Sequence, residues 1–178
     1  YILRYTKESK LRRAVHNKLL ELQGNIRVLC RVRPVLDVER RQAAGQDVDI
    51  TEISSDQDII ITRDEGNQRT KFEYDSVFSA TSLQEDIFSA VQPLCHSVLD
   101  GYNVCIFAYG QTGSGKTFTM EGVGVGDDAG ITPRAIASLF DATKSGDKDD
   151  DGNDEGVLSW TYRFELQILE IYNEKIID

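Results

Sequence analysis

One eight-residue segment limits the folds that are open to this chain. Residues 110 to 117 read Gly-Gln-Thr-Gly-Ser-Gly-Lys-Thr. The segment follows an unbroken apolar and aromatic run, Val104 to Tyr109, which predicts a strand buried on both faces of a parallel sheet. It precedes residues 117 to 122, which predict the start of a helix. A strand, a glycine-rich turn and a helix in direct succession indicate an α/β fold.

This arrangement predicts a loop that binds the phosphates of a nucleoside triphosphate together with magnesium. Backbone N–H groups must turn toward the phosphates, and glycines leave room for that approach. We expect Lys116 to reach the β- and γ-phosphates and the Thr117 hydroxyl to bind magnesium, with Lys116 the one catalytic candidate. The predicted phosphate site comprises Gly110, Gln111, Thr112, Gly113, Ser114, Gly115, Lys116 and Thr117. The loop alone leaves GTPases, kinases and motors open.

Strands are also expected on both sides of this loop. Loose alternation predicts a strand that stops at Pro34, since proline cannot continue a ladder. Turn residues at 64 to 66 predict a hairpin between two strand-like pieces. The expected strands are 26 to 33, 58 to 62, 71 to 78 and 160 to 172. Tyr74 and Phe78 are expected in the core.

Apolar side chains at helical spacing predict two further helices. Ser82 and Glu85 have the spacing of a capping box, and the helix that follows contains Pro93, which should kink it. The helix that starts after the glycine-rich loop is expected to break at Gly124–Gly130 and to resume over Pro133–Thr143.

The first 23 residues differ from the rest in charge. They hold a net charge of plus 4, whereas the remaining residues hold minus 14. Leu11, Val15, Leu19 and Leu22 recur at intervals of three and four, which predicts a basic amphipathic helix that ends near Gly24. Such a helix lies on its own domain or forms the end of a coiled coil, and two heptads leave both open.

Composition excludes several classes of protein. The net charge of minus 10 disfavours nucleic acid or anionic lipid as a partner of the whole surface. No apolar run is long enough to span a membrane, and the N-terminus lacks the pattern of a signal peptide. Cys30, Cys95 and Cys105 show no C-x-x-C spacing, and the first and last fall in predicted buried strands, which indicates reduced thiols in a cytosolic or nuclear compartment.

An acidic segment, residues 147 to 155, partly matches a calcium-binding loop. Asp147, Asp149, Asp151 and Gly152 fall on ligand and turn positions of such a loop. The twelfth position, where a bidentate glutamate is needed, is Leu158. We therefore expect a solvated surface insertion.

Five motifs, in this order and spacing, resemble the first half of a kinesin motor domain. They are Arg31-Val-Arg-Pro34, Phe72-Glu-Tyr-Asp-Ser-Val-Phe78, the long segment Gly101–Gly122, Ile131-Thr-Pro-Arg134 and Glu170-Ile-Tyr-Asn-Glu174. The junction Glu21–Pro34, with a helix in front of a strand, resembles the neck and motor junction of the kinesin-14, C-terminal-motor class. The resemblance covers the whole chain.

The resemblance implies a division into a neck helix, residues 1–23, that ends a coiled coil, and the N-terminal half of a motor domain, residues 24–178. The implied fold is a phosphate-loop NTPase with a mixed central sheet flanked by helices, truncated in this sequence. The implied ligands are ATP and magnesium. Arg31, Arg33 and Pro34 would border the adenine, and Phe118 would close the other side of its pocket. As an alternative, Phe118 is simply part of the core.

The same resemblance implies a cytoplasmic, cytoskeletal protein that forms a homodimer and moves toward the minus end of microtubules, without nucleic acid or membrane insertion. The family's two switch motifs, Ser-Ser-Arg-Ser-His and Asp-Leu-Ala-Gly-Ser-Glu, have no counterpart in these 178 residues. We therefore expect residues 1–178 alone to bind ATP without hydrolysing it. The alternatives are a non-motile kinesin-like protein that binds microtubules or cargo, and a phosphate-loop enzyme acting on small molecules.

Overall fold

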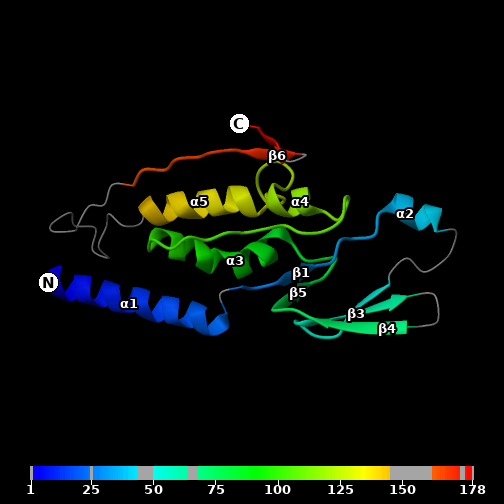
Figure 1. The fold of residues 1–178 in the computed structure, drawn as a ribbon, viewed down its shortest axis with the longest axis horizontal. Coiled ribbons are helices and arrows are strands. Elements are labelled where there is room, and N and C mark those ends of the chain that lie inside the picture. The colour runs from blue at the N-terminus through cyan, green and yellow to red at the C-terminus, as the bar shows by residue number, and fades with distance from the viewer. Residues whose placement is uncertain are drawn as a thin grey trace. The chain divides into compact units, whose positions relative to one another are not determined.

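A computed structural model describes residues 2–24, 26–43, 50–63, 68–144, 162–172 and 175–177. The chain divides into two compact units, Tyr1–Leu139 and Phe140–Asp178, and each is described by itself. Figure 1 shows the order of the helices and strands. Helices and strands both occur along the chain, in the order α1, β1, α2, β2–β5, α3–α5, β6 and β7, which confirms a mixed α/β organisation.

The N-terminal helix α1, Ile2–Gln23, is present as predicted. Arg13 Nε forms an ion pair with Asp100 Oδ1 at 2.9 Å, which ties α1 to the end of α3, Gln84–Leu99. Four apolar side chains of α1 are exposed nevertheless: Leu11 by 65%, Val15 by 61%, Leu19 by 54% and Leu22 by 77%.

The described strands of the first unit form two separate sheets. Strand β1, Leu29–Arg31, pairs in parallel with β5, Ser76–Phe78. Strands β2, Thr51–Ile53, β3, Asp58–Arg63, and β4, Gln68–Glu73, form an antiparallel sheet. The predicted hairpin is confirmed, since Asp58 lies opposite Glu73 and Arg63 opposite Gln68. The described residues do not join these strands into the single mixed sheet that was expected.

The expected strand over residues 71 to 78 is wrong, because Tyr74 and Asp75 divide it into β4 and β5. The Asp75 carboxylate accepts a hydrogen bond of 2.6 Å from the Val28 N–H, and the Asp75 N–H donates to the Val28 carbonyl. These contacts turn the chain from the antiparallel sheet to β1. A side-chain acceptor therefore decides where the strand ends.

A short helix α2, Asp37–Gln42, follows β1, and α3 follows β5. Helix α3 begins one residue later than its predicted capping box. The Leu83 N–H donates to Asp86 Oδ2 at 2.7 Å, so Asp86 and not Glu85 reaches back to the start of the helix. The Ser82 hydroxyl lies instead 3.2 Å from that of Ser79. Pro93 lies within the helix, as expected.

The core of the first unit is centred on Ile87 and Val91 of α3 and on Ile131 of α5, Ile131–Lys144. Partly buried side chains surround this cluster: Leu29, Phe78, Leu94, Ile106 and Met120. Phe78 thus packs in the core as predicted, and Tyr74 is half-buried. Strands β1 and β5 and helices α3, α4 and α5 all contribute to one apolar centre, with α4 spanning Lys116–Met120.

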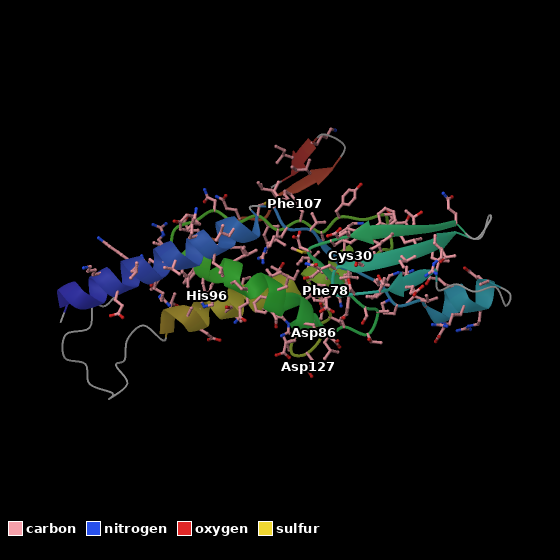
Figure 2. The ribbon with its side chains drawn as sticks, turned by 90° about the horizontal axis from the view of Figure 1, so that it is seen from below. Cys30, Phe78, Asp86, His96, Phe107 and Asp127 are labelled. Carbon is pink, nitrogen blue, oxygen red and sulfur yellow. The ribbon has the colours of Figure 1, made fainter. Side chains whose placement is uncertain are left out.

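The expected buried strand over Val104–Tyr109 is wrong in the described structure, where residues 102 to 110 form no ladder. Exposure alternates along it: Val104, Ile106 and Ala108 are half-buried, whereas Cys105, Phe107 and Tyr109 are exposed. Phe107, labelled in Figure 2, is exposed by 86%. Period-two burial is typical of an extended segment covered on one side, but a strand needs a neighbouring strand to pair with. The described residues supply none here.

The predicted interruption between α4 and α5 is confirmed. Hydrogen bonds across the loop 122–130 hold its two ends together. The Val123 N–H donates to the Asp128 carbonyl at 2.9 Å, and the Gly130 N–H donates to the Glu121 carbonyl at 3.0 Å. The Arg134 guanidinium donates to the carbonyls of Ala129 at 2.8 Å and Asp127 at 2.9 Å, and to that of Gly126 at 3.3 Å. One side chain of α5 thus holds the loop 122–130 in place.

The second unit contains a hairpin of β6, Glu170–Tyr172, and β7, Lys175–Ile177. The Phe140 and Phe164 rings pack with centroids 4.5 Å apart. The expected strand over residues 160 to 172 is largely wrong, because residues 162 to 169 form no ladder and only β6 pairs. Residues 160 and 161 and the acidic segment 147–155 lie outside the described residues.

Replacing Gly122 by alanine is expected to destabilise the protein strongly. Gly122 has φ +76°, and a Cβ there would lie 2.0 Å from the Asp128 carbonyl oxygen. We expect Gly122→Ala to lower the free energy of unfolding by about 3 kcal/mol, measured by thermal or urea unfolding. Gly124 is the matched control, since it has φ +66° but nothing within 4 Å of a Cβ, and should lose only about 1 kcal/mol. Equal losses would contradict the close packing.

Candidate functional site

The glycine-rich loop occupies the turn between the extended segment 102–110 and α4. Gly113 has φ +80° and Gly115 has φ +93°, a left-handed conformation that side chains other than glycine rarely adopt. The Ser114 N–H donates to the Gln111 carbonyl at 3.2 Å, which closes the turn. The first N–H groups of α4 have no partner within the helix, so they are available to an anion above the loop.

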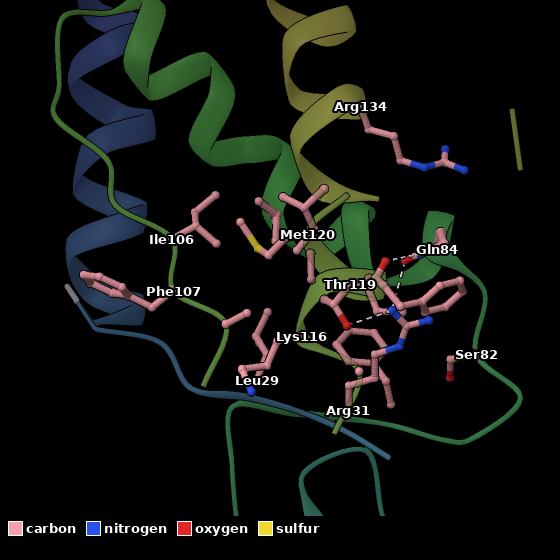
Figure 3. A pocket seen from close by; sticks show the side chains of 18 of the residues that line it. Leu29, Arg31, Ser82, Gln84, Ile106, Phe107, Lys116, Thr119, Met120 and Arg134 are labelled. Carbon is pink, nitrogen blue, oxygen red and sulfur yellow. Dashed lines mark hydrogen bonds between the residues drawn. The ribbon is translucent and has the colours of Figure 1, made fainter. Parts of the chain in front are cut away.

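Lys116 folds back across this loop. Its Nζ donates to the carbonyls of Gly110 and Gln111, each at 2.9 Å. The ammonium is therefore held at the open side of the turn by two backbone acceptors, with donor capacity left for one more group. Figure 3 shows Lys116 on the wall of the pocket near Leu29 and Arg31. Thr117, the next residue, is exposed.

Arg31, at the end of β1, reaches across to α3 and α4. Its Nη1 donates to Gln84 Oε1 at 2.9 Å and to Thr119 Oγ1 at 3.1 Å, and both bonds are drawn in Figure 3. Its Cζ lies 5.0 Å from the centre of the Phe118 ring, a cation–π contact. Burial lowers the pKa of Arg31, but an arginine stays protonated at neutral pH.

The contact between Arg31 and Phe118 changes the expected shape of the site. The resemblance implied that these side chains lie on opposite sides of a base, but a planar base needs about 7 Å between two flat groups that both touch it. At 5.0 Å the two groups touch each other and form one wall. Phe118 is exposed by 38%, which argues against its being only part of the core.

Arg33, two residues after β1, also lies next to this loop. Its Nη2 pairs with Glu39 Oε1, and Glu39 Oε2 accepts a hydrogen bond of 2.8 Å from the Leu36 N–H. The hydrogen bond from Arg33, reinforced by that from the backbone, lowers the pKa of Glu39. A Cβ on Gly115 would lie 3.9 Å from Arg33 Cγ and Cδ, so the arginine stem passes beside the glycine-rich loop. Pro34, the next residue, is exposed.

Within the described residues, the chain offers no group of three or more His, Cys, Asp or Glu side chains that could hold a metal ion. No described helix is long and apolar enough to cross a membrane. The three cysteines are free, with Cys95 buried, Cys30 half-buried and Cys105, against expectation, exposed.

Comparisons with known proteins identify the family to which this chain belongs. A family profile described as "Microtubule binding" matches residues 5–178. The chain is 43% identical over 175 residues to the kinesin-like protein KIN-14R of Oryza sativa subsp. japonica. It is 44% identical over 184 residues to the kinesin-like protein KIFC1 of Rattus norvegicus. The chain belongs to the kinesin family.

The kinesin relatives are much longer than this chain. The match to KIN-14R covers 98% of this chain but 16% of the relative, and the match to KIFC1 covers 94% and 25%. A solved structure of the C-terminal motor and motor homology domain of Kar3Vik1, fused to a synthetic heterodimeric coiled coil, is also similar. It shares 40% identity with a TM-score of 0.67, over 78% of this chain and 36% of that one. The chain is a portion of a kinesin motor domain, and its homologues are of the kinesin-14 class.

Sequence reasoning did not single out Gln84, which lies in this candidate site. Its side chain is only 3% exposed and bonds to Arg31 and to α4. The signal was present: Gln84 shares a helical face with Ile87, Val91 and Cys95, all buried. A polar residue on the apolar face of a helix needs a buried partner, and here the partners are the Arg31 guanidinium and the Phe118 carbonyl.

Proposed function

We propose that this chain binds ATP and magnesium through the loop Gly110–Thr117. The observation that carries the proposal is Lys116, whose ammonium is held over a turn in which Gly113 and Gly115 keep the backbone open. Lys116 would bind and neutralise the terminal phosphates, while the backbone of Gln111, Thr112 and Ser114 surrounds them. Magnesium, when bound, supplies further neutralisation of phosphate charge, and the exposed Thr117 hydroxyl would be its one ligand from this loop.

We propose that the adenine lies beside Arg31, Arg33, Pro34 and Phe118. The support is that these residues flank the phosphate loop on the side of β1 and that Arg31 and Phe118 together offer a flat cationic and aromatic surface. Such a surface suits a purine, since cations and aromatic rings both stack on its face. The base would lie against this wall and not between its two members.

For the complete protein we propose a microtubule-stimulated ATPase that couples hydrolysis to movement along microtubules. The support is membership of a microtubule-binding family and relatives of the kinesin-14 class. By analogy with that class, movement would be toward the minus end, and the protein would be cytoplasmic and associated with the microtubule cytoskeleton. A gliding assay with polarity-marked microtubules tests the direction, and binding without movement would favour a non-motile kinesin-like protein.

We also propose that residues 1–23 form the neck and end a coiled coil that makes the protein a homodimer. Leu11, Val15, Leu19 and Leu22 are all more than half exposed, although Arg13 binds Asp100. An apolar stripe left uncovered by its own domain is expected of a helix that packs on a second helix.

Replacing Lys116 by alanine is expected to weaken ATP binding by about tenfold or more, because one charge-assisted contact to phosphate is lost. Equilibrium binding of a fluorescent ATP analogue to the full-length protein measures the change. Thr117→Ala should instead reduce the ratio between the ATP affinity measured with magnesium and that measured without it. Lys10→Ala and Thr132→Ala, both at exposed positions outside the loop, are the matched controls and should bind as wild type. Wild-type affinity in Lys116→Ala would refute the site.

Charges on the apolar stripe of α1 are expected to break the dimer. Val15→Asp together with Leu19→Asp should weaken self-association of the full-length protein at least tenfold, since each buries a charge in an apolar seam. Sedimentation equilibrium measures the change. Lys10→Asp, on the same helix but outside the stripe, is the control. If the doubly substituted protein remains as dimeric as wild type, the neck proposal is wrong.

Residues 1–178 alone are expected to bind ATP without turning it over. A phosphate loop supplies binding, whereas phosphoryl transfer also needs a positioned water and stabilisation of developing charge. Phosphate release by this polypeptide, with and without microtubules, should not exceed that of its own Lys116→Ala variant, while a fluorescent ATP analogue still binds. Turnover comparable to that of the full-length protein would contradict this expectation.

A further inference from the structure

Gln84 joins three segments of the chain that meet at the base end of the site. It is the first residue of α3, and its side chain is 3% exposed. Its Oε1 accepts a hydrogen bond of 2.9 Å from Arg31 Nη1 on β1. Its Nε2 donates to the Phe118 carbonyl on α4 at 2.7 Å and to the Asp128 carbonyl of the loop 122–130 at 3.4 Å.

These partners leave Gln84 only one orientation. A guanidinium can only donate and a carbonyl can only accept, so the amide oxygen must face Arg31 and the amide nitrogen must face Phe118 and Asp128. Both N–H groups and the oxygen are then used. No other side chain of similar size is at once an acceptor for Arg31 and a double donor, since leucine offers neither and glutamate offers only acceptors.

The side-chain oxygen and nitrogen of Gln84 fix Arg31 and Phe118, the two residues that form one wall of the site. Its oxygen holds the Arg31 guanidinium, which is also held by Thr119 on α4. Its nitrogen holds the backbone of Phe118, whose ring lies under that guanidinium. Figure 3 draws the hydrogen bonds from Arg31 to Gln84 and to Thr119 as dashed lines. Gln84 therefore acts on the relative position of Arg31 and Phe118 through its hydrogen bonds to both.

We propose that Gln84 is a positioning residue for the base of the nucleoside triphosphate, because it holds Arg31 and Phe118 together as one flat wall. The proposal rests on the proposed ATP site. Gln84 makes none of the hydrogen bonds that hold the phosphate loop or Lys116, whose partners are Gly110 and Gln111. Loss of Gln84 should thus affect recognition of the base and leave recognition of the phosphates in place.

The test compares a ligand that has a base with one that has none. Equilibrium affinities for ATP and for inorganic tripolyphosphate, both with magnesium, are measured on the full-length protein and on Gln84→Leu. We expect Gln84→Leu to weaken ATP binding by about tenfold or more, the effect of unpairing one buried charged donor, and to change tripolyphosphate binding less than about twofold. Gln92→Leu makes the same change at an exposed position of α3 and should alter neither.

A second variant keeps the proposal testable if Gln84→Leu does not fold. Gln84→Glu keeps an acceptor for Arg31 but loses both donors to the carbonyls, so its preference for ATP over tripolyphosphate should fall between those of wild type and Arg31→Ala. The proposal is overturned if folded Gln84→Leu keeps the wild-type preference, if it loses both ligands equally, or if Gln84→Glu keeps the full preference. Failure of the wild type to bind ATP, or wild-type binding by Lys116→Ala, would instead refute the proposed function.

Discussion

The packing of Ile87 and Val91 against Ile131 is the contact on which the rest of the first unit depends. It places α3 against the start of α5, and the side chains around it come from β1, β5, α4 and the segment before the phosphate loop. Three of these elements carry parts of the site: Arg31 is the last residue of β1, Gln84 is the first residue of α3, and Lys116 and Phe118 belong to α4. The apolar centre therefore sets the distances between Arg31, Gln84, Lys116 and Phe118, although none of the four belongs to it. Burial of aliphatic side chains supplies the energy, and the polar contacts at its rim supply the geometry.

The sequence alone predicted those parts whose physics is local. Glycines at 113 and 115 adopt left-handed backbone because no other residue does so without strain, and the hairpin of β3 and β4 follows from alternation and turn residues. The missed features depend on contacts distant in sequence. Val104–Tyr109 is apolar enough for a strand, but a ladder requires a second strand that local pattern cannot supply. The role of Gln84 could not be predicted for the same reason, since only the tertiary structure shows which groups its side-chain amide bonds to.

The two arginines of the site have polar partners of different charge, and these partners determine how much positive charge each arginine offers to a ligand. Arg31 is bound by neutral groups, Gln84 and Thr119, so its full positive charge remains available to a ligand. Arg33 is paired with the Glu39 carboxylate, so much of its charge is compensated. In a chain with a net charge of minus 10, uncompensated cations next to the loop, Arg31 and Lys116, would attract an anionic nucleotide against the overall field.

The alternating exposure of residues 104 to 109 also affects the tendency of the polypeptide to aggregate during synthesis. Phe107 and Tyr109 lie on the open side of an extended segment, exposed by 86% and 101%. An unpaired extended segment with large apolar side chains is a template for any other strand, including the same segment of a second molecule. During synthesis this segment emerges before any later residue could cover it. The kinesin chain is therefore expected to be most prone to aggregate at this stage, when a chaperone that binds extended apolar peptides would protect it.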